Sequence, residues 1–261
     1  MQRQGFTLIE LSIVLVIIGL LAGGILGGQS LIHAAELRKT TNDLSRIQTA
    51  LNTFRDKYFY LPGDLPNATQ FWGSLNGGGI DDNCYTLLAT GEPTCNGNGN
   101  GIVDSGFSAT TFAERGRAWQ HLANAGLIEG QYNGYHGPTT GENRFGGVNA
   151  LKAPFSNSHY NYAFVGGVGP LDNRNFEMGA SHILEMTRDF SVTEANRDIL
   201  KAEDVWNIDT KLDDGRPATG SLRGPKRDNT LATGCTTTND ASAEYALTTT
   251  NNNCYYWFLI Q

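Results

Sequence analysis

Residues 6–28 read FTLIELSIVLVIIGLLAGGILGG and follow a short polar start, MQRQG. Between Phe6 and Leu26 the only ionisable side chain is Glu10. About 20 mostly apolar residues in a helix match the roughly 30 Å hydrocarbon core of a bilayer, and a helix satisfies its own backbone polar groups there. This stretch therefore predicts a membrane-spanning helix close to the N-terminus, around which the rest of the chain is organised.

Glu10 is the unusual residue of this run. A carboxylate inside a membrane segment costs on the order of 2.5–3.5 kcal/mol on insertion scales and usually has a partner. No Lys or Arg follows Glu10 within two helical turns. Cleavage after Gly5 would create an α-amino group on Phe6, four residues earlier and on the same helix face, in the same or a neighbouring chain.

The segment Gly5-Phe6-Thr7-Leu8-Ile9-Glu10 resembles the class III signal of type IV pilins and type II secretion pseudopilins. In that family a membrane-embedded prepilin peptidase cuts after the glycine and methylates the new N-terminal phenylalanine. The glutamate is thought to register incoming subunits against the filament. The resemblance implies cleavage after Gly5, N-methylation of Phe6, and roles in subunit assembly for Phe6 and Glu10.

The same resemblance implies partners and a location. The partners are the prepilin peptidase, other pilin or pseudopilin subunits, assembly platform proteins and the bacterial inner membrane. The chain would cross that membrane once, with its N-terminus in the cytoplasm and its head in the periplasm, and would then enter a pilus or pseudopilus filament.

Ordinary interpretations of the apolar run compete with this one. A cleaved signal peptide could use Ala22-Gly23-Gly24, but the run exceeds the usual h-region of 7–15 residues and contains Glu10. A lipoprotein signal would need Cys where Gly24 stands. A plain N-terminal anchor would need neither cleavage nor a role for Glu10.

The helix is predicted to continue beyond the membrane. A mostly apolar stripe recurs at spacings of three and four, which is typical of one buried helix face; its members are Leu37, Thr40, Leu44, Ile47, Leu51, Phe54 and Tyr58. Pro62 biases Leu61 away from helical dihedrals, so we expect the helix to end near Tyr58, about 80 Å from Phe6. A coiled-coil dimer is the alternative explanation of this stripe.

These features predict four segments: a leader at 1–5, a transmembrane or filament-core helix at 6–28, its amphipathic continuation at 29–60, and a head at 61–261. The fold class expected is α+β, a pilin-like spine packed on a head with an antiparallel sheet. A second helix is expected over 111–125, and strands at 160–165 and 183–186. The capping-box pattern Ser191-x-x-Glu194 predicts a third helix reaching Leu212. Two paired strands are expected at 243–247 and 255–260.

Glycines at 23, 24, 27 and 28 interrupt the apolar helix. Each costs about 1 kcal/mol relative to Ala in a helix interior. They favour either a place where the helix stretches or melts during assembly, or close packing against another helix through small residues.

The four cysteines form an even set without C-x-x-C spacing. Cys84–Cys95 and Cys235–Cys254 are the economical pairs, although four cysteines allow three connectivities. Oxidised pairs indicate a periplasmic or extracellular head.

One loop carries a weak calcium pattern. Oxygen-bearing side chains alternate with glycine, and Gly101 stands sixth, as in a Ca²⁺ loop; the candidate ligands are Asn96, Asn98, Asn100, Ile102 and Asp104. Phe107 stands where the bidentate glutamate belongs. The alternative is a turn-rich loop clipped by a disulfide, and no cofactor is predicted with any firmness.

No catalytic residues are predicted. The segment Asp209-x-x-x-Asp213-Asp214-Gly215-Arg216-Pro217 is similar to a pattern of the same prepilin group, and we interpret its carboxylates as capping a helix end. A net charge of −7 argues against nucleic-acid partners, and the basic group Arg216, Arg223, Lys226 and Arg227 is interpreted as a solvated loop. The chain is therefore predicted to be a structural subunit, minor or large. An adhesive or DNA-binding pilus head and a merely anchored periplasmic domain are the alternatives.

Overall fold

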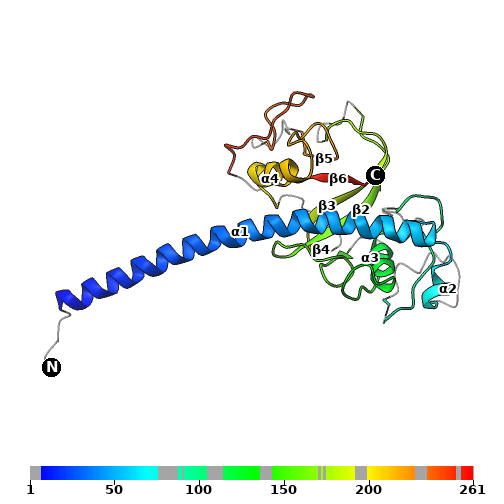
Figure 1. Cartoon of the computed structure of the whole chain (residues 1–261), viewed down its shortest axis with the longest axis horizontal. Coiled ribbons are helices and arrows are strands. Elements are labelled where there is room, and N and C mark those ends of the chain that lie inside the picture. Colours follow the sequence, from blue (N-terminus) through cyan, green and yellow to red (C-terminus); the bar gives the residue numbers. More distant parts are fainter. Residues whose placement is uncertain are drawn as a thin grey trace.

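The computed structural model describes residues 7–75, 88–89, 91–104, 114–135, 143–169, 172, 175–191, 199–226, 234–250 and 254–260. One long helix carries a head built from short helices and an antiparallel sheet, and the N-terminal half of that helix projects away from the head (Figure 1). This arrangement confirms the predicted α+β fold class.

Helix α1 (Leu8–Tyr58) is continuous over 51 residues, which is about 75 Å at 1.5 Å per residue. Phe59 ends it in a left-handed conformation with φ of 62°, and its N–H donates to the Arg55 carbonyl at 2.8 Å. Pro62 follows shortly afterwards. The predicted end of the helix near Tyr58 is therefore confirmed.

The predicted stripe on α1 is the face that the head covers. Six of its members are buried: Leu37, Thr40, Leu44, Ile47, Leu51 and Phe54. Their apolar surface is removed from water within one chain, so a coiled-coil partner is not needed to explain the spacing.

The main sheet has the strand order β2-β3-β6-β5, and every neighbouring pair is antiparallel. Its strands are β2 (Ser158–Val165), β3 (Ser181–Arg188), β5 (Leu222–Arg223) and β6 (Trp257–Ile260). The strands predicted at 160–165 and 183–186 lie inside β2 and β3. Two further short strands, β1 (Asn143–Arg144) and β4 (Phe190–Ser191), pair with each other.

Three shorter helices belong to the head: α2 (Ala68–Trp72), α3 (Glu114–Asn124) and α4 (Ala202–Leu212). Helix α3 lies within the range predicted for the second helix. The predicted start of the third helix at Ser191 is wrong, because Ser191 is paired in β4 and α4 begins only at Ala202. Leu200 exchanges backbone hydrogen bonds with Cys254, and this pairing excludes it from the helix.

The predicted strand at 243–247 is also wrong. Tyr245 makes only an isolated antiparallel bridge with Thr236, whereas β6 pairs with β3 and β5. The apolar residues of this segment pack instead: Ala243 and Tyr245 are buried at 2% and 5% exposure.

Polar contacts fix α1 to the head at the point where the bare part of the helix ends. His33 Nε2 lies 2.7 Å from Asp204 Oδ1 on α4. Further along, the Tyr160 hydroxyl on β2 donates to Asp43 Oδ2 at 3.2 Å. The head therefore holds α1 from about His33 onward and leaves the earlier residues uncovered.

Leu44→Ala should destabilise the head by about 2–5 kcal/mol, because it removes a fully buried side chain at the interface with α1 and leaves a cavity. Chemical unfolding of the full chain in detergent, followed by the fluorescence of buried Trp119, measures the effect. Thr49→Ala on the exposed face of the same helix is the matched control. Equal midpoints for the two variants would contradict the assigned packing face.

Candidate assembly site

The N-terminus of α1 is closed by a capping box between Thr7 and Glu10. The Thr7 hydroxyl accepts from the Glu10 N–H at 3.3 Å, while the Thr7 N–H and hydroxyl both donate to Glu10 Oε2 at 2.8 Å. Such a cap satisfies backbone donors that the first helical turn leaves open. The sequence places Glu10 three residues after a threonine, which is the spacing that this cap requires.

The cap leaves part of Glu10 unused. Both hydrogen bonds from Thr7 fall on Oε2, and Oε1 has no hydrogen bond among the residues that the structure describes. Thr7 is neutral, so the cap also supplies no positive charge. Among the residues that the structure describes, Glu10 therefore keeps a free acceptor and an unbalanced charge at the start of the apolar helix.

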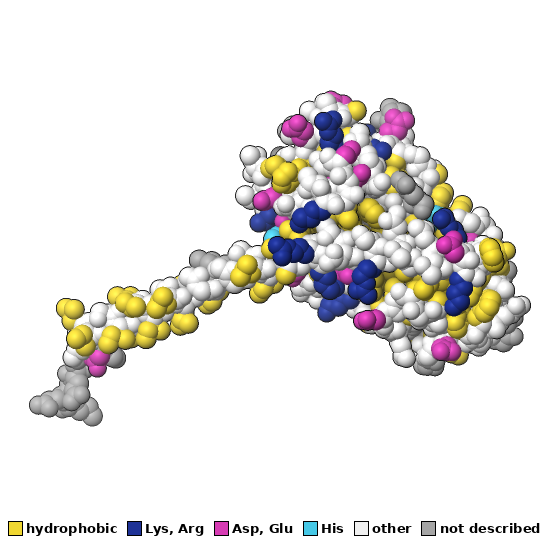
Figure 2. Space-filling model, viewed as in Figure 1, with side chains coloured by type: hydrophobic (Ala, Val, Ile, Leu, Met, Phe, Trp, Pro, Cys, Tyr) yellow, Lys and Arg dark blue, Asp and Glu magenta, His cyan; other side chains and the backbone are white. Residues whose placement is uncertain are grey.

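The first half of α1 is an uncovered apolar surface. The exposed fraction of its large side chains is 86% at Leu8, 50% at Val14 and 51% at Ile17. Figure 2 shows this half as a bare rod with many hydrophobic side chains and with acidic colouring near its N-terminal end. In the described part of the chain, α1 is the one helix long and apolar enough to cross a membrane, and its most apolar window is 0% buried.

The glycines of this half pack against no other part of the chain that the structure describes. A Cβ added at Gly23, Gly24, Gly27 or Gly28 would meet nothing within 4 Å, apart from the helix's own backbone. The helix runs through them without a break. If these glycines serve close packing, the neighbour must be another molecule, and a melting segment stays the other hypothesis.

A comparison with protein families decides what this helix is. Residues 1–26 match the family model for the prokaryotic N-terminal methylation motif. This chain carries the signal of type IV pilins and pseudopilins. No curated protein and no solved structure matches the chain. The pilin-type signal implies processing by a prepilin peptidase and assembly with other pilin subunits, and it points to a structural subunit rather than an enzyme.

The residues predicted to be processed, Gly5 and Phe6, lie outside the described residues, so cleavage and methylation there stay predictions. Glu10 is described, on the first turn of α1, and the structure brings it together with Thr7. Thr7 was missed by sequence reasoning, although the Thr-x-x-Glu spacing before an apolar run is the signature of a capping box.

The predicted calcium loop is only partly assembled. Asn98 Nδ2 and Asn100 Nδ2 each lie 3.4 Å from Asp104 Oδ2. The side chain of Asn96 is used elsewhere, since its Oδ1 accepts from the Thr69 N–H at 2.9 Å. Two other oxygens of the loop bind its own backbone: Asn98 Oδ1 accepts from Asn100 N–H, and Asn100 Oδ1 accepts from Ile102 N–H. Calcium binding here stays a prediction.

Two buried carboxylates from outside the loop hold it in place. Asp64 and Glu114 together accept four backbone N–H groups at 2.8–3.0 Å, those of Asn98, Asn100, Gly101 and Asp104. Burial, helped by the charges of Asp64 and Asp104, raises the pKa of Glu114 to about 8 against the effect of its hydrogen bonds. Burial also raises the pKa of Asp64. No local sequence pattern marks either residue, because both reach the loop through the fold.

The acidic group at the end of α4 caps turns, as the sequence interpretation proposed. Asp213 Oδ2 accepts from the N–H groups of Ser221 and Leu222, and Asp214 Oδ1 accepts from the Arg216 N–H at 2.8 Å. The oxygens of Asp209, Asp213 and Asp214 lie within 4.8 Å of one another, a spacing that a metal ion could use. Each of these carboxylates already has protein donors, so the group is explained as a structural cap.

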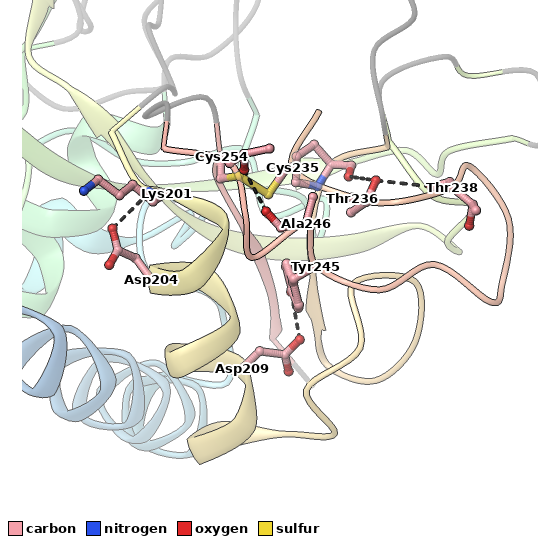
Figure 3. The surroundings of a disulfide bond; sticks show 11 residues. Lys201, Asp204, Asp209, Cys235, Thr236, Thr238, Tyr245, Ala246 and Cys254 are labelled. Carbon is pink, nitrogen blue, oxygen red and sulfur yellow. Dashed lines mark hydrogen bonds between the residues drawn. A yellow bond between two sulfur atoms is a disulfide. The ribbon is translucent and has the colours of Figure 1, made fainter. Parts of the chain in front are cut away.

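Asp209 ties this cap to the C-terminal loop. The Tyr245 hydroxyl donates to Asp209 Oδ2 at 2.8 Å, and the Gly215 N–H donates to Oδ1 at 3.2 Å. Figure 3 shows Tyr245 pointing from the loop onto Asp209 beneath the Cys235–Cys254 disulfide. Burial, together with the charges of Asp214 and Asp213, raises the pKa of Asp209 to about 7.

The disulfide Cys235–Cys254 joins two buried cysteines whose Cα atoms are 5.3 Å apart. Cys95 is also buried and disulfide-bonded. Its predicted partner Cys84 lies outside the described residues, so that pairing stays a prediction.

The predicted basic group is only partly described, since Arg227 lies outside the described residues, and two of its members bind nearby carbonyls. Arg223 donates to the carbonyls of Gly220 and Ala218, and Lys226 donates to the Asp172 carbonyl at 2.7 Å. These bonds give the two side chains a structural role.

The raised pKa of Asp209 predicts a pH dependence of stability. The folded pKa of about 7 lies above the ordinary value of 3.8, so the folded state binds the extra proton. Stability should be highest below pH 4 for this group and should fall as the pH rises through 7. Asp209→Asn should therefore stabilise the head at pH 8 by roughly 1–2 kcal/mol, less than the whole shift implies because solvent screens this cluster.

Thermal unfolding of the full chain between pH 4.5 and 8.5 tests this. Tyr245 can still bond an asparagine, since a hydroxyl both donates and accepts. Glu203→Gln, an exposed change on the same helix, is the control and should leave the pH profile unchanged. A profile of Asp209→Asn parallel to that of the wild type would contradict the assignment.

Proposed function

We propose that this chain is a prepilin-like structural subunit that is cleaved after Gly5, N-methylated on Phe6 and assembled into a type IV pilus or type II secretion pseudopilus. The observation that carries the proposal is the uncovered apolar half of α1, which follows directly on the methylation motif at residues 1–26. Before assembly this half lies in the inner membrane, and afterwards it lies among the helices of neighbouring subunits.

The physical reason is the size of the uncovered surface. Burial of apolar surface is worth roughly 25 cal/mol per Å², and α1 exposes large side chains on all sides from Leu8 to Ile32. Such a surface is unstable in water and marks a membrane or protein contact. A rod of this kind has no catalytic geometry, and its work is assembly.

The proposed topology puts the N-terminus in the cytoplasm and the head in the periplasm. The buried Cys235–Cys254 disulfide supports an oxidising compartment for the head. The segments we propose are the leader at 1–5, the membrane or filament-core helix at 6–28, the amphipathic helix at 29–60 and the head at 61–261. The assembly platform proteins are further proposed partners.

The head is larger than a compact pilin needs, which favours a minor or large subunit. An adhesive or DNA-binding head is the alternative function for such a subunit. A plain anchored periplasmic domain is the outcome that would replace the proposal as a whole.

Intact-mass and N-terminal peptide analysis of the membrane-extracted chain tests the proposal, with and without an active prepilin peptidase. We expect a chain beginning at N-methylated Phe6 only when the peptidase is active. Gly5→Val should block this cleavage, because the added side chain changes the residue before the cut, whereas Gln4→Ala should not. A chain that still begins at Met1 beside an active peptidase, or one cut near Gly24, would refute the proposal.

A further inference from the structure

A groove of about 610 Å³ runs along α1 on the side of the head. Its apolar lining residues include Ile47, Leu127, Ile128 and Leu151. Cations also line it, among them Arg46 and Lys152, and Figure 2 shows Lys and Arg side chains gathered beside α1 where it meets the head. We call this the spine groove. Apolar side chains together with cations suit a helix that is apolar and carries one acid.

Arg46 is the cation of the spine groove that is available for a partner. It is exposed, and it makes no hydrogen bond or ion pair with the described residues. Lys39, by contrast, is paired with Asp43 at 3.0 Å. Asp43 also accepts from Tyr160, and Glu129 is the other acid that lines the groove.

We propose that the spine groove receives the bare N-terminal helix of a second copy of this chain, with Glu10 of one copy beside Arg46 of the other. The inference rests on the function proposed above and names the contact surface for it. Glu10 is the only ionisable residue of the bare half before Leu26, and its Oε1 atom is free of the Thr7 cap. A desolvated carboxylate of this kind usually has a partner, and Arg46 offers a cation.

The helical register supports the same pairing. Glu10 and Arg46 are 36 positions apart in the sequence, so two parallel copies displaced by about 54 Å bring them level. At that displacement Val14 lies level with Ala50 and Ile17 with Thr53, both of which line the groove. Residues 10, 14 and 17 share one helix face, as do 46, 50 and 53, so the acid and the apolar side chains reach the groove together.

The contact joins two different surfaces, the start of one helix and the middle of another. Such a heterologous contact produces a filament when the rotation between successive copies does not close a ring. Copies are therefore expected to stack in a line, each receiving the helix of the next.

Disulfide cross-linking of the full chain tests the pairing, in membranes that contain active prepilin peptidase. Glu10→Cys with Arg46→Cys in one chain should give a ladder of covalent multimers under oxidation, because each copy offers both partners. A mixture of chains carrying one change each should stop at dimers. Glu10→Cys with Arg38→Cys is the matched control, since Arg38 is also an exposed arginine of α1 but lies two turns from Arg46; it should give no ladder.

A charge exchange gives the second measurement. Glu10→Arg and Arg46→Glu should each abolish multimers in native chemical cross-linking, and the double variant should restore them. Arg38→Glu should not abolish the multimers, and combined with Glu10→Arg it should not restore them.

The outcomes separate this inference from the function on which it rests. If the N-terminal mass shows processing at Phe6 but the ladder forms equally with Arg38→Cys, or does not form, the pairing with Arg46 is refuted while the prepilin function stands. A cross-link to a different subunit, identified by mass spectrometry, would refute the second copy as occupant. Loss of processing itself would refute the function and the inference together.

Discussion

The constraint on which this structure depends is that one unbroken helix must serve two different surroundings. A helix closes its own backbone hydrogen bonds, so α1 can leave the head without leaving orphaned polar groups. Its side chains differ between the two halves. Beyond about His33 only one stripe is apolar, and the head covers it. Before that point apolar residues surround the helix axis. Because α1 is continuous, the stripe also fixes how far the head stands from the uncovered apolar half of the helix.

The parts that the sequence predicts well are those set by local periodicity. The extent of α1 and its buried face follow from residues three, four and seven apart, and no distant part of the chain is needed to find them. The strands β2 and β3 are marked by runs of aromatic and branched side chains. The start of α4 was missed for the opposite reason. Leu200 pairs through its backbone with Cys254, more than fifty residues later, and this pairing keeps it out of the helix. A capping pattern at Ser191 contains no information about such a distant contact.

The same distinction divides the candidate functional residues. Gly5, Phe6 and Glu10 belong to a short motif that can be identified from the sequence alone. Asp64 and Glu114 become partners of the Asn-Gly loop only once the turn after α1 and helix α3 are in place. Tyr245 was expected in a strand, and its burial was foreseeable; that its hydroxyl reaches Asp209 was not, because the contact spans two segments joined by the disulfide loop. The spine groove likewise exists only where α1 meets residues near 127 and 151.

Glu10 shows how one side chain can meet two demands. The first helical turn needs an acceptor for its open N–H groups, and Oε2 supplies it through Thr7. That bond lowers the cost of the carboxylate but leaves its charge, so a cation must still approach Oε1. In a chain cut after Gly5, the new α-amino group and an arginine of a second copy are competing sources. The chain's own amine belongs to Phe6, four residues before Glu10 in the sequence, and is present with or without a neighbour. The amine of a neighbouring chain and an arginine of a second copy arrive only with the neighbour, and so these two cations make the energy of Glu10 depend on assembly. A charge that registers subunits must be of this second kind, because a cost already met within one chain cannot distinguish a correctly placed neighbour from none.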